Sequence, residues 1–235
     1  TDMLTPAVGA TLITAALDYR QRTNKGQWID LSQFETGVNH MPTTILDYTV
    51  NGRVATRCGN QDAAACPHAA YRCQGHDRWL SIVVTTDEEW RAFVNVMDNP
   101  AWAHTARFST RDNRKVHEEE LNHLISSWTE PQDALVLENR LQQAGVAAGL
   151  VAKQSDLFED PQLKDREFFA WCDHKVMGRS PYDGLMSHLS KTPGAIASAP
   201  LLGEHYEEIL RDLLNFSEDQ IAELIAQGVI EMHLE

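Results

Sequence analysis

The sequence predicts an α/β protein in which a smaller α+β unit interrupts a larger domain. Helix-type spacing and a short strand-like run open the chain, strand-like runs and then helices fill its middle, and strands and helices alternate again near its end. With 235 residues and 43% hydrophobic content, the chain can bury a core and suits one large or two small domains. We therefore expect three regions, residues 1–57, 58–152 and 153–235, of which the first and last belong to the large domain.

The first region is expected to contain two helices and one strand. Apolar residues recur at helical spacing over residues 3–19, where alanine and glycine also permit close packing. After the turn at Gly26, apolar residues around a polar one predict a short strand at residues 28–31. A second helix is expected at residues 32–50.

The middle region is expected to open with a β-hairpin. Strand-like runs at residues 70–73 and 78–84 flank Gln74-Gly75-His76-Asp77, a composition typical of a turn. A helix should begin at Thr86, because the spacing to Glu89 is that of a capping box. Two further helices are expected at residues 112–128 and 131–143, the second with Thr129 as its cap and Gly145 as its stop.

The last region alternates strands with helices. Ser217 and Gln220 predict a capping box at the start of the final helix, and Gly228 follows the end of that helix. Before it, strands are expected at residues 150–152, 168–176 and 185–189, and a helix at residues 203–214.

Composition and charge favour a cytoplasmic, globular protein. A net charge of −14 would repel phosphate backbones and anionic lipid surfaces, which argues against nucleic-acid and membrane partners. No stretch approaches the ~20 consecutive apolar residues that span a bilayer, and the first residues lack the pattern of a signal peptide. The cysteines are too few and too unevenly placed for a disulfide framework and are expected to be free thiols: Cys58, Cys66, Cys73 and Cys172.

Asp2 is the first candidate for chemistry. It precedes a helix whose unpaired backbone N–H groups and dipole favour an ionised carboxylate by about 0.3–1 kcal/mol. Such a carboxylate is available as a nucleophile at neutral pH. Aspartate is also a common helix N-cap, which is a purely structural role. The residues around Asp2 leave both roles open.

Several motifs follow Asp2 along the chain. They are the Ala- and Gly-containing run of residues 9–17, Arg20-Gln21-Arg22-Thr23-Asn24-Lys25-Gly26-Gln27, Trp28-Ile29-Asp30-Leu31, Gly59-Asn60, Pro67-His68-Ala69-Ala70-Tyr71, Thr192-Pro193-Gly194, Ala199-Pro200-Leu201-Leu202-Gly203-Glu204-His205 and Gly228-Val229-Ile230. In this order they resemble the family III CoA-transferases, which include formyl-CoA transferase, carnitine CoA-transferase and the α-methylacyl-CoA racemases. The resemblance covers nearly the whole chain and places Asp2 where the family has its nucleophile.

The resemblance implies a fold and an assembly. The chain would be part of a nucleotide-binding-type large domain plus the smaller α+β domain, in an interlocked dimer. Family members carry a large CoA-binding segment ahead of the catalytic aspartate. We therefore expect a homo- or hetero-oligomer with a chain that supplies this segment, unless the sequence is a fragment of a longer one.

The resemblance also implies a reaction. Asp2 would attack the thioester of an acyl-CoA to give a mixed anhydride, and CoA thiolate would convert this anhydride to an aspartyl-CoA thioester. A second carboxylic acid would then take the CoA by the reverse steps. Coenzyme A thioester is a substrate in this scheme, and no permanently bound cofactor is expected.

Gly59, Asn60 and Gln61 form the candidate substrate-binding loop, because their amides could stabilise the tetrahedral oxyanions. An ordinary turn explains this sequence equally well. Formyl-CoA transferase has a glycine-rich run at this place, so its replacement here favours the carnitine-type and broader members. His68 is a further candidate to contact the thioester or the carboxylate substrate, although most histidines beside a strand are structural.

No metal site is expected. Cys66, His68, Cys73 and His76 loosely approximate a zinc-binding set. A strand through Tyr71 would nevertheless point alternate residues to opposite faces, and the spacing matches no usual zinc finger.

Two other functions remain open. A 2-methylacyl-CoA racemase or epimerase would use the aspartate with a histidine placed upstream to exchange the α-proton, and it needs no second acid. Alternatively, the chain is an inactive fragment or a non-catalytic subunit. Such a chain would bind a partner but show no acyl-CoA-dependent change at Asp2.

Overall fold

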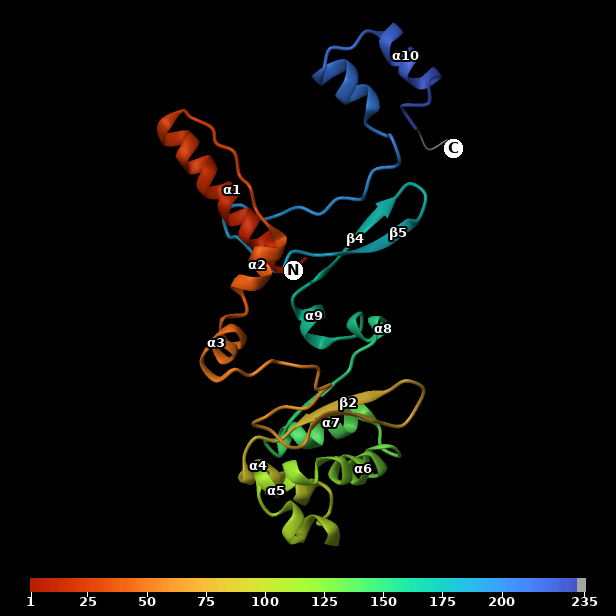
Figure 1. Ribbon diagram of the computed structural model, residues 1–235. Helices are drawn as coiled ribbons and strands as arrows, with labels where there is room; N and C mark the ends of the chain where they lie inside the picture. The colour runs from red at the N-terminus through yellow and green to blue at the C-terminus, as the bar shows by residue number, and fades with distance from the viewer. Residues whose placement is uncertain (232–235) are drawn as a thin grey trace. The chain divides into compact units, whose positions relative to one another are not determined.

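The structure is a computed structural model that describes residues 1–231 (Figure 1). Its contacts divide the chain into two compact units, Thr1–Ala64 and Ala65–Glu235. The boundary between them lies a few residues after the expected end of the first region. The expected division of the remainder into a middle and a last region stays a prediction.

The first unit consists of three helices joined by segments without regular secondary structure. They are α1 (Leu4–Thr23), α2 (Gln33–Asn39) and α3 (Pro42–Asn51). α1 was expected and is one turn longer than its apolar spacing predicts. It ends at Asn24, which adopts a left-handed conformation at φ 57° and donates its backbone N–H to the carbonyl of Arg20. α1 and α2 pack against each other within this unit.

Two expectations for the first unit are wrong. Residues 28–31 form no strand, because neither sheet of the described residues offers them a neighbour to pair with. The helix expected at residues 32–50 is instead two helices. Pro42 disfavours a helical conformation at Met41, which adopts φ −116° and ψ 35°, and Pro42 then occupies the first turn of α3.

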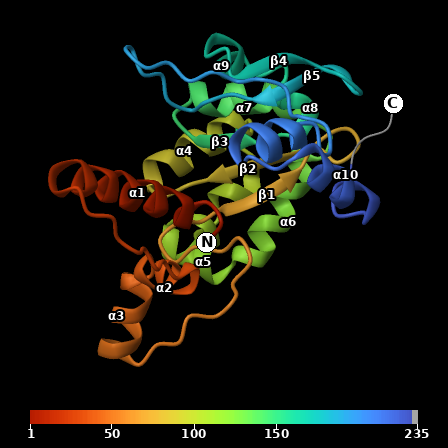
Figure 2. The same cartoon turned by 90° about the horizontal axis from the view of Figure 1, so that it is seen from above.

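The second unit begins with an antiparallel sheet in the order β1-β2-β3, which Figure 2 shows from above. Its strands are β1 (His68–Arg72), β2 (Trp79–Val83) and β3 (Ala147–Leu150). The predicted hairpin is confirmed, with Ala70 opposite Ser81 and Ser81 opposite Gly149. β3 lies a few residues earlier than the strand expected at residues 150–152.

Helices cover this sheet and enclose the core. They are α4 (Asp87–Val96), α5 (Arg111–Val116), α6 (Glu118–Thr129) and α7 (Ala134–Gln143), with short 3-10 turns η1 (Ala101–His104) and η2 (Ala106–Phe108). α6 contacts β1, and α7 contacts β2 and β3. Leu80 and Ile82 alternate with more exposed residues along β2, so one face of the sheet is buried. They pack in one cluster with Phe93, Leu121 and Leu137.

The capping box of α4 is confirmed, since Thr86 accepts from the N–H of Glu89 and Glu89 accepts from the N–H of Thr86. The helix expected at residues 112–128 is interrupted at His117, whose φ of −110° and ψ of 26° are not helical. Thr129 does not cap the following helix. It ends α6 and donates its hydroxyl to the carbonyl of Arg72, while Asp133 caps α7. Gly145 follows α7 at φ 81°, as expected of a stop.

The rest of the second unit holds short helices and a two-stranded hairpin. The elements are α8 (Gln154–Leu157), α9 (Pro161–Asp165), β4 (Phe169–His174), β5 (Gly178–Asp183), the π-helix η3 (Glu208–Leu213) and α10 (Glu218–Ala226). The strand expected at residues 185–189 is wrong. β5 forms earlier, despite Pro181, because an edge strand of a two-stranded sheet tolerates proline.

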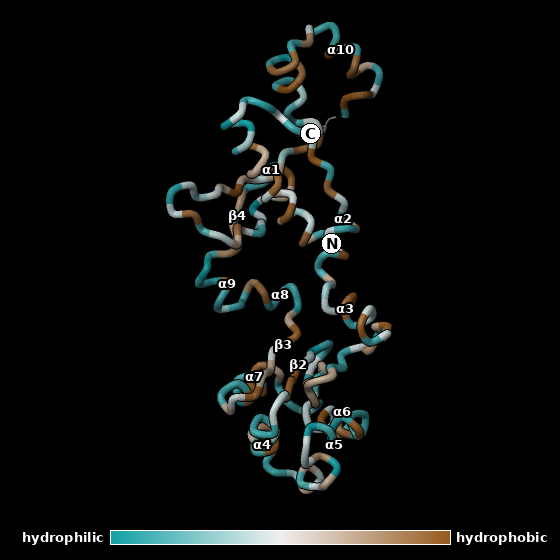
Figure 3. The backbone as a smooth tube through the Cα atoms, turned by 60° about the vertical axis from the view of Figure 1, so that its left-hand side comes forward, coloured by the Kyte–Doolittle hydropathy of each residue, from teal (hydrophilic) through white to brown (hydrophobic). Residues whose placement is uncertain are grey.

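Near the end of the described chain, one expected helix is shorter than expected and the other begins and ends as expected. The helix expected at residues 203–214 is reduced to η3 within that range. The capping box of Ser217 and Gln220 is confirmed in α10, and Gly228 follows at φ 70°. Hydrophobic stretches of α3 and α10 stand out in Figure 3.

Candidate functional site

Asp2 lies in the turn that leads into α1. The backbone N–H groups of Leu4 and Thr5 both donate to the carbonyl of Thr1. The helix N-cap is Met3, which makes no side-chain capping bond, so Asp2 does not serve as the cap. Its Oδ1 instead accepts a hydrogen bond of 2.5 Å from Nε2 of Gln33. The capping interpretation of Asp2 is therefore wrong.

The Asp2 side chain is exposed and lines an open surface cavity of about 730 Å³ within the first unit. Small and apolar residues of α1 line most of it, together with two residues of the segment that leads into α2. The lining residues are Asp2, Thr5, Pro6, Gly9, Ala10, Ile13, Leu31 and Gln33. The hydroxyl oxygen of Thr5 is buried and has no hydrogen-bond partner among the described residues. The cavity thus combines a carboxylate, an amide and a hydroxyl with a largely apolar wall.

The start of α2 determines where the Gln33 side chain lies. Ser32 is the N-cap of α2 and accepts from the N–H of Glu35 at 3.2 Å, while its carbonyl accepts from the hydroxyl of Thr36. Gln33 is consequently the first residue of the helix. α2 also packs closely against Thr1 at Gly37, because a Cβ added to Gly37 would lie 2.9 Å from Cγ2 of Thr1. α2 therefore lies directly against the turn that carries Asp2.

Gly59, Asn60 and Gln61 form a turn in the same unit. Gly59 has φ 61°, which glycine adopts without strain, and the N–H of Gln61 donates to the carbonyl of Cys58 at 3.1 Å. None of the three lines the cavity beside Asp2. Their expected role as donors to the substrate stays a prediction.

His68 belongs to the second unit. It is the first residue of β1, lies opposite Val83 and is half-buried. It is not a lining residue of the Asp2 cavity. Its expected contact with substrate also stays a prediction.

Sequence reasoning missed Gln33 and Thr5. Ser32 and Glu35 mark the start of α2, but nothing in the sequence says that the Gln33 amide turns toward the preceding helix. Thr5 stands within an expected helix, where a threonine carries no special signal. The proximity of both residues to the Asp2 cavity depends on the packing of α1 against α2.

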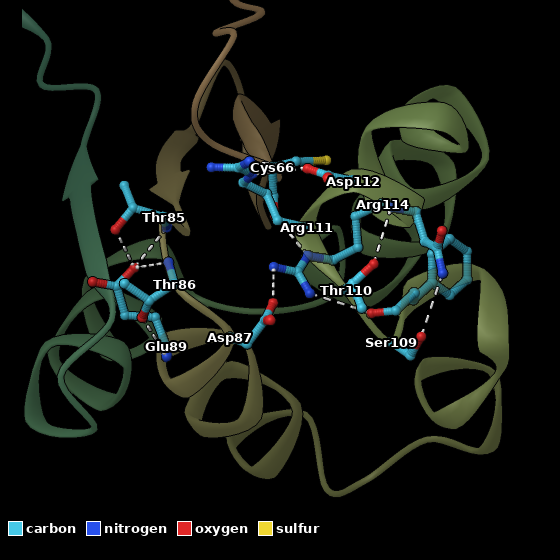
Figure 4. A network of polar contacts seen from close by, with 12 residues as sticks. Cys66, Thr85, Thr86, Asp87, Glu89, Ser109, Thr110, Arg111, Asp112 and Arg114 are labelled. Carbon is cyan, nitrogen blue, oxygen red and sulfur yellow. Dashed lines mark hydrogen bonds and ion pairs between the residues drawn. The ribbon is translucent and has the colours of Figure 1, made fainter.

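A second polar cluster surrounds Arg114 in the second unit (Figure 4). The Arg114 side chain is completely buried, and its Nη2 pairs with Oδ1 of Asp87 at 3.0 Å. Nε and Nη1 donate to the carbonyls of Cys66 and Phe108, and the guanidinium lies 4.8 Å from the ring centre of Trp90. Each contact is to a different segment of the second unit, so the Arg114 side chain holds these segments together.

Burial changes the acidity of the groups in this cluster. Desolvation lowers the pKa of Arg114, and hydrogen bonding to Asp87 opposes that shift. Desolvation, with the charge of Glu118 as a smaller cause, raises the pKa of Cys66 to about 11. Cys66 is therefore a protonated thiol at neutral pH and a poor nucleophile or metal ligand.

Residues 1–231 contain no group of three or more histidine, cysteine or acidic side chains that could hold a metal ion. Among the same residues, no helix is both long enough and apolar enough to cross a membrane.

Comparison with known proteins places the fold in one class. Residues 1–206 match CoA-transferase family III. A crystal structure of a CaiB/BaiF family protein from Brucella suis superposes with a TM-score of 0.77 at 25% identity, covering 89% of this chain and 54% of that one. The protein is thus of the mixed α/β type found in that structure. The chain belongs to CoA-transferase family III.

Curated relatives of this chain are also named as CoA-transferases. A probable CoA-transferase of Mycobacterium tuberculosis is 32% identical over 97% of this chain and 29% of its own length. Two Chloroflexus aurantiacus relatives are the succinyl-CoA–D-citramalate CoA-transferase, 30% identical, and the succinyl-CoA–L-malate CoA-transferase β subunit, 26% identical, each over 97% of this chain and 57% of the relative. The chain therefore spans between 29% and 57% of the length of these relatives.

Proposed function

We propose that the protein transfers CoA from an acyl-CoA thioester to a carboxylic acid, with Asp2 as the nucleophile. The observation that carries the proposal is the position of Asp2. Its carboxylate makes no capping bond, faces a cavity with a largely apolar wall and has one oxygen held by an amide. Family membership and the transferase names of the relatives support the same reaction class.

In the proposed cycle, one Asp2 oxygen attacks the thioester carbon of the donor and CoA leaves as its thiolate. The thiolate then attacks the Asp2 carbon of the mixed anhydride, which expels the donor's carboxylate and leaves an aspartyl-CoA thioester. The acceptor carboxylate displaces CoA from Asp2, and CoA attacks the acceptor's carbonyl in the new anhydride. Asp2 regains its charge at the end of the cycle.

The relatives suggest the first substrates to test. The two Chloroflexus relatives are named for succinyl-CoA and for hydroxy acids. We propose succinyl-CoA as the donor class and a small polar acid as the acceptor. Gly59, Asn60, Gln61 and His68 remain the proposed contacts to these substrates. No permanently bound cofactor is required by the cycle.

We further propose that the active form is an oligomer in which a second chain or segment supplies most of the CoA-binding charge. The net charge of −14 supports this, because CoA is itself polyanionic and needs local cations. One relative carries the name of a β subunit, which is consistent with assembly from more than one chain. An interlocked homodimer is the alternative assembly.

The test of the function is an assay of CoA transfer from succinyl-CoA by the enzyme as it occurs naturally. The rate is measured with and without each of a panel of small hydroxy acids as acceptor. Asp2→Asn should lower the rate of CoA transfer at least about 10³-fold, because it removes the nucleophile. Asp18→Asn is the matched control, since Asp18 is 60% exposed and its one ion pair among residues 1–231 is with Arg22 on the same helix. Its rate should stay within about twofold of the wild type.

Two results would contradict the proposal. One is full transfer activity in Asp2→Asn. The other is turnover of a 2-methylacyl-CoA with exchange of its α-proton and no need for an acceptor acid, which would establish the racemase instead.

A further inference from the structure

Gln33 lies against the reactive group of the proposed cycle. Its Nε2 donates to Oδ1 of Asp2 from the first turn of α2, and both residues line the same cavity. The position of Gln33 follows from the Ser32 cap and from the packing of Gly37 on Thr1. The amide is thus placed by the fold and does not depend on a bound substrate.

The proposed cycle contains tetrahedral intermediates of two kinds. When Asp2 attacks the donor thioester, negative charge develops on the oxygen of the substrate. When CoA or the acceptor attacks the carbon of Asp2, that carbon's π-bond opens and the charge develops on the aspartyl oxygen that remains bound. Collapse of this second kind of intermediate expels a carboxylate or the CoA thiolate, so charge balances in each direction.

An amide that donates to Asp2 Oδ1 lies where the second kind of charge appears. In the resting enzyme it holds Oδ1 and leaves Oδ2 to attack. In the anhydride and in the thioester, Oδ1 becomes a carbonyl oxygen with a donor already in place. A donor fixed before reaction stabilises the transition state without the cost of reorganising water.

We propose that Gln33 is a catalytic residue that stabilises the oxyanion formed on Asp2 itself, in the steps that make and break the aspartyl-CoA thioester. This inference rests on the proposed function, since it requires Asp2 to form the covalent intermediates. It assigns to Gln33 a task that amides near the substrate carbonyl cannot perform.

The chemistry of glutamine suits this task. Its side-chain amide donates at every working pH and carries no charge that would compete with the developing oxyanion. Asp2 and Gln33 are both exposed, and Pro6, Gly9 and Ile13 give the open cavity beside them a largely apolar wall. The buried Thr5 hydroxyl, which has no partner among the residues described, lines the same cavity.

The first test is Gln33→Leu in the natural enzyme. Loss of one pre-placed oxyanion donor should lower kcat by about 10²-fold. Gln21→Leu makes the same chemical change at an exposed position of α1 that does not line the cavity, and its kcat should equal that of the wild type. Circular dichroism and thermal unfolding of both variants show whether the fold is retained.

The second test separates a catalytic role from a merely structural one. In Gln33→Glu, two neighbouring carboxylates share a proton in mildly acidic solution, so a protonated Glu at position 33 can donate to Asp2 as the amide does. As the pH falls from about 8 to about 5.5, the kcat of Gln33→Glu divided by that of Gln33→Leu should rise at least about fivefold. A residue needed only for packing would give a constant ratio.

Trapping in the wild type separates failure of this inference from failure of the function. If no acyl-CoA-dependent adduct forms at Asp2 in the wild type, the proposed function is wrong and the inference is wrong with it. If the adduct forms but Gln33→Leu keeps its kcat, or the ratio does not change with pH, only the role of Gln33 is overturned. A drop in kcat together with the pH-dependent ratio supports it.

Discussion

At the scale of single residues, one carboxylate and one amide define the proposed chemistry. Asp2 could be singled out from the sequence because motifs follow it in a recognisable order. Gln33 could not, because its contact depends on how α2 packs against the turn before α1. The sequence also suggested a capping role for Asp2, and the structure assigns the cap position to Met3 instead.

Arg114 permits a prediction of stability at this scale. Arg114→Met should lower the free energy of unfolding by about 2–4 kcal/mol, because the buried carbonyls of Cys66 and Phe108 lose their donors. The loss of the ion pair adds less, since the side chain of Asp87 is 48% exposed and can be solvated. Urea unfolding at constant pH measures the difference.

Arg111→Met is the matched control for Arg114→Met. The Arg111 side chain is 46% exposed and pairs with the adjacent Asp112, so its loss should change stability by less than about 0.5 kcal/mol. Equal destabilisation by the two substitutions would show that burial of Arg114 is not the reason for its contribution.

At the scale of elements, local signals predicted well wherever a cap or a turn decided the structure. The hairpin of β1 and β2 and the starts of α4 and α10 were all anticipated from short-range patterns. Expectations were wrong where a strand needed a partner from elsewhere in the chain, and where a proline inside an expected helix ended that helix. Residues 28–31 found no neighbouring strand among those described, and Pro42 divided an expected helix.

The capping box of α4 makes stability depend on pH. The backbone N–H of Thr85, and then its hydroxyl and the N–H of Thr86, hold the pKa of Glu89 below its ordinary 4.5. A group whose pKa is lowered by folding stabilises the fold above about pH 4.5, and this contribution is lost as the pH falls through the folded pKa. Glu89→Gln should therefore lose less stability than the wild type between about pH 6 and about pH 3.

Thermal unfolding midpoints across that pH range measure the effect. Glu88→Gln is the control, because it removes the same charge from a side chain that is 76% exposed and, within the described part of the chain, pairs with Arg91 alone. Its pH dependence should follow the wild type. If Glu89→Gln also follows the wild type, the capping box does not contribute to acid sensitivity.

At the scale of the whole molecule, large apolar side chains remain exposed in the first unit. Trp28 is 90% exposed and Phe34 is 78% exposed, and α1 contains no buried residue. Large exposed apolar surface marks an interface in a protein that folds normally. The sequence could predict the family and the class of fold, but a packing face that needs a partner gives no local signal of what covers it.

We predict that the natural protein associates in solution through this surface. Trp28→Ser should shift its sedimentation toward smaller species, because the substitution removes a large apolar contact. Val116→Ser in the second unit is the control, since Val116 is 78% exposed but lies on α5, a short helix outside the first unit. A wild type that sediments as a single chain would contradict the prediction.

We predict that Asp2 becomes covalently attached to CoA during the proposed cycle. The most direct measurement is intact-mass and peptide-mapping mass spectrometry of the enzyme incubated with succinyl-CoA, with and without borohydride to reduce a thioester. We predict a CoA adduct that borohydride removes, with the modification confined to the peptide that contains Asp2 and missing in Asp2→Asn. An active wild type whose Asp2 peptide stays unmodified, or an adduct on another residue, would contradict the account.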